Sequence, residues 1–290
     1  MRIDLHTHST ASDGTDSPAE LMAAAVASGL DVIAITDHDN TGGWAPALAA
    51  RPAELAVIRG AEFSTLIPGG GRLVSVHLLG YLFDPAAPAI VAEQARLRDE
   101  RLHRGMGIVD RMVAAGVPIS RQQVMEIAGD APVGRPHIGR ALVASGVVAS
   151  VDEAFASYLA GRSQFYVPKA DTDLISAVDM IAAAGGVSVI AHPRGRGEFR
   201  ALDFDTVAML VDHGLGGLEV DHPDHDDAAR AELGSFVERL GLIATGSSDY
   251  HGTNKVLRLG QETTREEQLG RILAASSGVV APVGPGGSLW

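Results

Sequence analysis

The sequence predicts an α/β protein with a barrel-like parallel sheet that a helical insertion interrupts. Short runs rich in Val and Ile, bounded by turn residues, alternate with helical patterns, which is typical of repeated βα units. Several runs are almost entirely apolar, as in VIAIT and VSVIA, and such strands are usually covered on both faces. One long stretch, residues 95–166, contains several helical patterns and no strand pattern. We therefore expect one large domain that is split by an insertion.

Seven segments have the length and composition of buried strands. Their shortness and their Val and Ile content favour strand over the alternative of a buried helix. In chain order, the predicted strands cover residues 2–6, 31–36, 56–63, 73–81, 187–191, 217–220 and 242–246. We expect these strands to run parallel, as in other βα architectures.

The insertion is expected to be helical throughout. Its helical patterns are the charged RLRDERLHR run near residue 100, a segment from Ser120, and residues 135–144 and 151–159. The charges are typical of a solvated helix face. We predict a barrel domain formed by residues 1–94 and 167–278, with residues 95–166 as a cap over the substrate. Residues 279–290, which include PVGPGGS, are expected to form a loop or a loosely packed end.

Composition restricts the function. The chain has no cysteine, so any metal must be held by nitrogen and oxygen ligands. The formal net charge of −13 argues against a broad electrostatic grip on duplex DNA, which requires Lys and Arg to neutralise several phosphates. Divalent cations would reverse the field inside a cleft, so a small phosphorylated substrate or a short RNA end remains compatible with an acidic chain.

No segment is expected to enter a membrane. The N-terminal MRIDLH runs straight into polar residues and lacks the apolar core of a secretory signal. The apolar run from Leu21 to Ile35 is broken by Ser28 and Asp31 before it reaches the ~20 residues that a membrane helix requires. We expect a cytoplasmic location and no membrane partner, and no oligomeric state is predicted.

The first predicted strand ends in His6-Thr7-His8. Residues two apart on an extended chain point to the same side, so both imidazoles can face one ion while Thr7 points away. An isolated pair of this kind is more commonly a pair of hydrogen-bonded core or surface histidines.

The pattern recurs at other predicted strands. Residues with nitrogen or oxygen side chains follow or lie within them, namely Asp37, His38, Asp39, Glu62, His77, His192, Asp249 and His251. The carboxyl ends of parallel strands meet at one rim of the sheet, where ligand sites form. The sequence therefore predicts a metal centre at this rim.

The ordered motifs DLHTHSTASDG, AITDHD, GAEFS, HLLGY, AHP and GSSDYHG resemble those of the PHP family, named for polymerase and histidinol phosphatase. The resemblance covers nearly the whole chain, apart from details of the insertion and the tail. It implies a distorted (β/α)7 barrel that holds two or three divalent metal ions. The implied ligand sets are His6, His8, Glu62 and Asp249 for the first ion, Glu62, His77 and His192 for the second, and Asp13, His38 and His251 for the third.

Such a ligand mix suits phosphoester hydrolysis. Closely spaced divalent ions lower the pKa of a bridging water to form hydroxide, and they neutralise a phosphoryl group during in-line attack. Imidazole with carboxylate suits manganese, iron or zinc, and we expect manganese. All nine positions carry competent ligands, so we expect an active metal-dependent phosphoesterase in which Asp13 and His38 take part in catalysis.

Two further segments, Val133-Gly134-Arg135-Pro136-His137 and Tyr166-Val167-Pro168-Lys169, resemble those of the family branch that acts on nucleotides and RNA ends. The planar guanidinium of Arg135 would donate two hydrogen bonds to a phosphate, and the ammonium of Lys169 would add a positive charge. Arg194 is a third candidate for phosphate binding. The alternative for Arg135 is an ordinary first helical turn in solvent. His137 is the candidate general acid, and metal-bound solvent is the alternative.

Other polar and aromatic residues have weaker support. Glu219 and Asp221 are expected either to orient ligand imidazoles or to be hydrated rim carboxylates. The histidines without motif support, which we expect on the surface or in loops, are His103, His213, His222 and His225. The aromatic residues nearest to motifs, and so the candidates for a base platform, are Phe165, Tyr166 and Tyr250.

The choice of substrate depends on Asp13. Histidinol phosphatases carry histidine at the equivalent place, so Asp13 favours the nucleotidase branch. Similarity to that branch implies removal of the 3′-phosphate from nucleoside 3′,5′-bisphosphates and 5′-to-3′ trimming of short RNA. The alternatives are a histidinol phosphate phosphatase and a non-catalytic, metal-stabilised interaction module.

Overall fold

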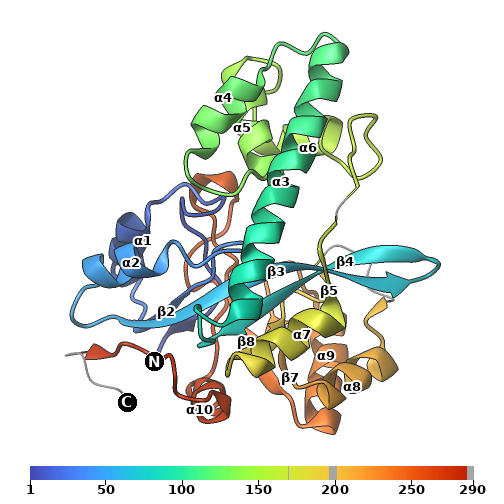
Figure 1. The fold of residues 1–290 in the computed structure, drawn as a ribbon. Coiled ribbons are helices and arrows are strands. Elements are labelled where there is room, and N and C mark those ends of the chain that lie inside the picture. Colours follow the sequence, from blue (N-terminus) through green and yellow to red (C-terminus); the bar gives the residue numbers. More distant parts are fainter. Residues whose placement is uncertain (169, 196–200, 286–290) are drawn as a thin grey trace.

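The computed structural model of the chain describes residues 1–168, 170–195 and 201–285. Its centre is a sheet that curls into a nearly closed barrel (Figure 1). In their order across the sheet, the strands are β1 (Ile3–Asp4), β2 (Val32–Ile35), β3 (Ala56–Gly69), β4 (Arg72–Tyr81), β6 (Val187–Ile190), β7 (Leu215–Asp221) and β8 (Ile243–Gly246). A parallel bridge between Thr7 and Tyr250 joins the continuations of the two outer strands, β1 and β8. The predicted barrel and all seven predicted strands are confirmed, and a short strand β5 (Thr172–Asp173) pairs with β3 in addition.

The prediction of parallel strands is wrong for β4. This strand pairs antiparallel with both β3 and β6. Gly70 and Gly71 form the turn between β3 and β4 with φ values of 59° and 79°. A two-residue hairpin turn requires positive φ at both positions, which glycine adopts without steric cost. The Gly-Gly pair was therefore a local hairpin signal, and the hairpin extends β3 beyond its predicted end to Gly69.

Helices pack around the barrel strands (Figure 1). They are α1 (Pro18–Ala27), α2 (Trp44–Ala50), α7 (Leu174–Ala183), α8 (Phe204–Asp212), α9 (Asp227–Leu240) and α10 (Glu266–Ala275), with a 3₁₀ turn at Gly252–Asn254. Helix α1 begins with a capping box in which Ser17 and Glu20 satisfy each other's backbone N–H groups. All four residues of β2 and of β6 are buried, as expected for strands covered on both faces.

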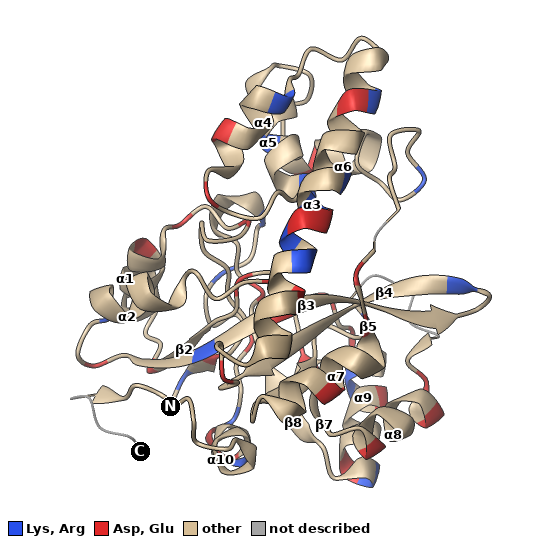
Figure 2. Cartoon of the chain, in the orientation of Figure 1, with Lys and Arg blue, Asp and Glu red and all other residues tan. Residues whose placement is uncertain are grey.

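The insertion forms a second helical layer above the barrel rim. Its helices are α3 (Pro88–Ala114), α4 (Arg121–Ala128), α5 (Arg135–Ala144) and α6 (Val151–Ser157). Helix α3 belongs to both parts, because Ile90 and Leu97 pack in the barrel core while Ile108 and Met112 pack in a separate core with α4 to α6. Acidic and basic positions are interleaved along the middle of α3 (Figure 2). The predicted domain boundaries stay a prediction, and α3 starts before residue 95.

Residues 279–285 contact the start of β3. Val280 is buried, and Val283 exchanges two backbone hydrogen bonds with Val57 at the start of β3. Arg59 also donates to the carbonyl of Ala281. Of the two expectations for this stretch, these contacts favour a loop over a loosely packed end. Across the part of the chain that the structure describes, no helix is long and apolar enough to cross a bilayer.

Candidate metal centre

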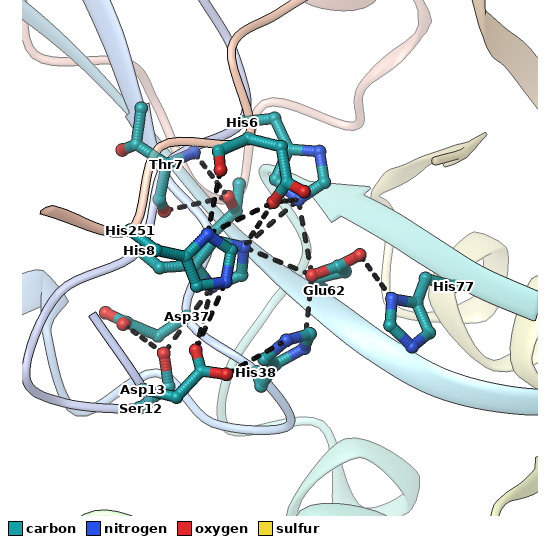
Figure 3. A network of polar contacts seen from close by, with 12 residues as sticks. His6, Thr7, His8, Ser12, Asp13, Asp37, His38, Glu62, His77 and His251 are labelled. Atoms are coloured by element: carbon teal, nitrogen blue, oxygen red, sulfur yellow. Dashed lines mark hydrogen bonds and ion pairs between the residues drawn. The ribbon is translucent and has the colours of Figure 1, made fainter. Parts of the chain in front are cut away.

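Glu62 lies at the centre of the predicted site and is almost completely buried. Figure 3 shows imidazoles gathered around its carboxylate. Five ring nitrogens lie within 3.2 Å of its oxygens, with His6 Nε2, His8 Nε2 and His38 Nδ1 near Oε2, and His77 Nδ1 and His192 Nε2 near Oε1. The carboxylate therefore contacts side chains from four other segments of the barrel.

The antiparallel strand β4 explains how His77 reaches this carboxylate. His77 lies opposite Ser64 in the β3–β4 ladder, and Glu62 lies two residues before Ser64 on the same face. Such diagonal neighbours on one face of a sheet are within reach of long side chains. The Nδ1 atom of His77 is 2.8 Å from Oε1 of Glu62. His77 thus enters the site from the middle of a strand rather than from its carboxyl end.

The alternation predicted for His6-Thr7-His8 is present. Thr7 points away and donates its hydroxyl to the carbonyl of Ala34, while the Nε2 atoms of His6 and His8 lie 3.1 Å apart. Both of these nitrogens face Glu62 and also lie 3.4 Å from Oδ1 of Asp249. Two ring nitrogens directed at the same two carboxylates form the geometry of a cation site.

Asp13 is presented by a tightly organised loop. Asp37 holds the loop by accepting hydrogen bonds from Ser9 N–H and the hydroxyls of Ser9 and Ser12, at 2.6 to 2.8 Å. Gly14 packs so closely that a Cβ atom there would lie 2.5 Å from the carbonyl oxygen of His8. The STASDG sequence thus places the Asp13 carboxylate beside the second and seventh predicted strand ends.

Two further imidazoles face Asp13. Its Oδ1 is 3.4 Å from His251 Nε2, and its Oδ2 is 3.8 Å from His38 Nε2. Asp13, His38 and His251 are therefore together, as the family resemblance implies, and His8 Nδ1 lies 3.9 Å from the same carboxylate.

The donor atoms fit divalent cations. Three groups of side chains bring their donor atoms within 4.8 Å of one another, and these are His6, His8, Glu62 and Asp249, then His38, Glu62 and His77, and then His8, Asp13, His38 and His251. Asp13 Oδ1, His38 Nδ1 and Glu62 Oε2 are buried and have no hydrogen-bond partner. Buried polar atoms are normally satisfied, so orphaned atoms that face one another indicate a missing partner. A cation with nitrogen and oxygen ligands would satisfy them.

The charges of the carboxylates support this fit. Although burial opposes ionisation, interactions with His38 and His6 hold the pKa of Glu62 well below its usual range. The pKa of Asp13 is also held well below its usual range, because His38 and His251 outweigh the cost of burial. Burial disfavours a charged His6, yet Glu62 and the neighbouring carboxylates raise its pKa well above normal. The cluster thus concentrates negative charge in a low-dielectric setting, where a divalent cation is most strongly favoured.

Three non-glycine residues with strained backbone conformations also lie at this rim. Asp39, His192 and Asp249 have positive φ values of 54°, 30° and 52°. Positive φ is costly for residues with a Cβ atom and is retained where the surrounding structure enforces it, commonly at functional sites. Asp39 is held in place by Ser64 N–H at 2.7 Å and by Arg101 Nε at 2.5 Å.

Glu219 orients two of the histidines, which is one of its two predicted roles. Its Oε1 lies 3.2 Å from His6 Nδ1, and its Oε2 accepts the backbone N–H of His192 at 2.7 Å. Although burial opposes ionisation, His6 lowers the pKa of Glu219 to about 2. Asp221 does not contact the cluster and instead pairs with Arg230 at 3.0 Å.

His222 and His225 lie in a loop, which is one of the two expectations, but they are buried and not on the surface. Both are buried in the turn that follows β7, and His222 Nε2 lies 3.8 Å from Oδ2 of Asp249. The sequence signal is the repeated histidine of His222-Pro223-Asp224-His225 directly after a strand, at the same rim. His103 and His213 are exposed, as predicted.

A cavity of about 400 Å³ opens beside the cluster. Its walls come from both the barrel and the insertion. The barrel contributes candidate ligands and polar residues, namely Asp13, His38, Glu62, Ser64, His77, Ala170, Asp171, His192, Asp249, His251, Asn254 and Lys255. The insertion contributes Glu100, Arg101, Arg104, Arg135, Pro136, Val151, Asp152 and Phe155.

The predicted phosphate-binding residues have different surroundings. Arg135 lines the cavity. Arg194 does not, because its guanidinium donates to Glu232 at 2.8 Å and to the carbonyl of Leu202 at 3.1 Å. These contacts hold the guanidinium away from the cavity, contrary to its predicted role. Lys169 lies outside the described residues.

His137 is also not a lining residue of the cavity. Its ring is buried, its Nδ1 accepts the N–H of Gly134 at 2.9 Å, and it hydrogen-bonds to the backbone of Ser12. Burial lowers its pKa to about 4. Because the ring hydrogen-bonds to the backbone of both Gly134 and Ser12, its geometry favours a structural role, in which His137 links α5 to the Asp13 loop. It does not favour the predicted role as general acid.

Three cavity residues have no signal in the sequence patterns. Lys255 places its Nζ 2.5 Å from Oδ2 of Asp249, and Arg101 joins α3 to Asp39. Phe155 brings an aromatic ring to the cavity. The predicted aromatic candidates lie elsewhere: Phe165 is buried against Tyr158, Tyr250 donates its hydroxyl to Asp16, and Tyr166 does not line the cavity.

Comparison with known proteins agrees with the fold and the site. Residues 4–92 match the PHP domain family. The chain is 34% identical to a 5′–3′ exoribonuclease of Haemophilus influenzae, covering 90% of this chain and 93% of that protein. It is also 34% identical to a 3′,5′-nucleoside bisphosphate phosphatase of Chromobacterium violaceum, covering 86% and 87% of the two chains.

A solved structure extends the match over the whole chain. A Bifidobacterium adolescentis protein assigned as a metal-dependent phosphoesterase superposes with a TM-score of 0.90 at 33% identity, covering 96% of this chain and 97% of that one. With the buried His, Asp and Glu cluster at the barrel rim, these similarities identify the chain as a phosphoric ester hydrolase, a member of the PHP family of metal-dependent phosphoesterases.

Proposed function

We propose that this enzyme removes the 3′-phosphate from nucleoside 3′,5′-bisphosphates and trims short RNA from its 5′ end. The observation that carries the proposal is the Glu62-centred cluster at the floor of a cavity whose opposite wall carries a cation and an aromatic ring, Arg135 and Phe155. A cytoplasmic location, where nucleotides and RNA are turned over, belongs to the same proposal.

The nine predicted ligands would hold two or three divalent ions, with manganese as the first choice and iron or zinc as alternatives. We propose Glu62 as the carboxylate shared between ions, because it contacts at least one imidazole of each of the three implied ligand sets, namely His6, His77 and His38. When bound, such ions supply positive charge at the phosphoryl group and lower the pKa of an attacking water. Asp13 and His38 line the cavity and keep their proposed catalytic role as ligands that face the substrate.

The cations of the chain would bind and orient the phosphate. Arg135 and Lys255 line the cavity from opposite sides, one from the insertion and one from the barrel. A guanidinium can form two parallel hydrogen bonds to phosphate oxygens, and an ammonium adds a point charge. We propose these two residues as phosphate ligands and leave Arg194 and His137 out of the site.

Two observations favour a nucleotide over histidinol phosphate. The relatives described above are named as an exoribonuclease and a bisphosphate phosphatase. The third ligand set also contains Asp13, where the resemblance assigns histidine to histidinol phosphatases. Both observations support a substrate that carries a nucleoside.

The test is a side-by-side assay of the manganese-loaded protein on adenosine 3′,5′-bisphosphate and histidinol phosphate, with release of inorganic phosphate as the readout. We expect a clear preference for the bisphosphate in kcat/KM. A preference for histidinol phosphate would overturn the choice of substrate. The variants His38→Ala and Asp13→Ala should lose most of the activity with the fold retained, and undiminished turnover by both would remove these residues from the catalytic site. Absence of turnover by the manganese-loaded wild type on every phosphoester would support a non-catalytic module.

A further inference from the structure

The roof of the cavity carries an aromatic ring that metal chemistry does not require. Apart from histidines, Phe155 is the one aromatic side chain among the described residues that line the cavity. It lies on α6 with Val151, and Pro136 of α5 is close by in the lining. The opposite wall is formed by the candidate ligands and Lys255. Phe155, Val151 and Pro136 are therefore the apolar side chains of an insertion wall that otherwise carries charged residues.

The ring of Phe155 is held in place before any ligand enters. The guanidinium of Arg135 lies 5.2 Å from its centroid, and Arg135 also donates to the carbonyl of Leu159 at 3.0 Å. Ser150 caps the start of α6 by accepting the N–H of Glu153. Phe155 packs against the core of the insertion and is only half-buried. A ring fixed by a cation and by core packing loses little conformational entropy when a ligand binds.

We propose that Phe155 forms a base-binding subsite, in which the nucleobase of the substrate stacks on the ring while its phosphate lies at the floor. This inference rests on the proposed function and names the part of the substrate that the roof recognises. Stacking on an aromatic side chain tolerates every base, because every base has a π face. The site therefore selects nucleoside phosphates over sugar phosphates that lack a base, without selecting among bases.

The experiment compares adenosine 3′,5′-bisphosphate with its base-free analogue, 1-deoxyribose 3,5-bisphosphate. The wild-type enzyme is expected to prefer the nucleotide in kcat/KM. The variant Phe155→Leu keeps an apolar side chain against the insertion core but removes the flat ring. It should reduce that preference by roughly 10- to 100-fold, mainly through KM for the nucleotide, and Phe155→Tyr should restore it.

A matched control separates stacking from a general loosening of the insertion. Phe165→Leu makes the same change at a buried ring of the insertion core that does not line the cavity. It should leave the nucleotide preference as in the wild type. Melting temperatures of both variants report their effect on the fold. Equal losses on both substrates in Phe155→Leu, or no loss on either, would overturn the proposal.

A binding measurement separates this inference from the proposed function. Calorimetry compares the Kd values of adenosine 5′-monophosphate and ribose 5-phosphate in the wild type and Phe155→Leu. If the wild type hydrolyses neither bisphosphate but binds the monophosphate more tightly through Phe155, the proposed activity fails and the subsite stands. If it hydrolyses both bisphosphates with equal kcat/KM, the activity stands and the subsite fails.

Discussion

The Nζ atom of Lys255 lies 2.5 Å from Oδ2 of Asp249, while Oδ1 of the same carboxylate lies 3.4 Å from ring nitrogens of His6, His8 and His251. The two oxygens thus face different environments. One faces the imidazole cluster, and the other is held by an ammonium that lines the cavity. Against the cost of burial, Lys255 is the main cause of an Asp249 pKa well below its usual range.

Replacing Lys255 by methionine should lower kcat/KM for adenosine 3′,5′-bisphosphate by roughly 10- to 100-fold, because one charge-assisted hydrogen bond is lost. Lys255→Arg keeps the charge and should recover part of the loss. Steady-state kinetics and metal content measured together distinguish substrate binding from metal binding. Unchanged kinetics in the methionine variant would remove Lys255 from the site.

The substitution Glu62→Gln should abolish the centre. The amide keeps the shape of the side chain but cannot bridge two cations, so we expect a loss of turnover of at least about 100-fold and a lower manganese stoichiometry. Glu232→Gln is the matched control, because Glu232 is exposed and pairs with Arg194 outside the cavity. Elemental analysis and activity of the two variants give the comparison. A Glu62→Gln enzyme that retains both would contradict the bridging role.

Removal of metal should destabilise the folded chain. The buried carboxylates of the cluster repel one another when no cation is bound, and metal at about 100 times its Kd stabilises by roughly 2.7 kcal/mol. We expect chelation to lower the melting temperature by roughly 5 °C and manganese to restore it. The Glu62→Gln variant should show a much smaller response. Identical melting curves with and without chelator would mean that no tightly held ion is present.

Arg135 and Arg194, both candidates for phosphate binding from the sequence, should behave differently. Arg135→Met should raise KM for the bisphosphate, since Arg135 lines the cavity. Arg194→Met should leave kinetics close to the wild type, because its guanidinium is bound to Glu232 and Leu202. Comparable KM increases in both variants would show that Arg194 leaves these partners and reaches the substrate.

His137 should make stability depend on pH. Its pKa is lowered to about 4 by burial, against 6.5 for an unperturbed histidine, so the unfolded chain binds more protons between these values. Stability should therefore fall as pH drops from about 6.5 towards 4, with a contribution of roughly 3 kcal/mol when the full window is crossed.

The variant His137→Asn removes this titration, so its free energy of unfolding in urea should change less between pH 7 and pH 4.5. His213→Asn alters an exposed histidine and should follow the wild-type profile. If the His137→Asn and wild-type profiles are parallel, His137 does not carry the acid sensitivity.

The strand positions could be predicted from local patterns, and most candidate ligands from their places at strand ends. The full set of nine, with Asp13, followed from the resemblance to the PHP family. A short apolar run predicts a buried strand. His6 and His8 face the same side because side chains alternate between the two sides of an extended chain. The direction of β4 was not predicted correctly, because the apolar pattern of residues 73–81 does not depend on whether the strand is parallel or antiparallel to its neighbours. Only the Gly70-Gly71 turn indicated the hairpin.

The sequence by itself determined which residue types meet at the barrel rim and hence that cations and phosphate esters belong there. The tertiary structure alone decided that Lys255 holds Asp249, that Arg194 is bound to Glu232, and that Phe155 rather than Phe165 reaches the cavity. The physical reason is that a long or flat side chain has several possible partners. Which of them it meets depends on how segments far apart in the chain pack together.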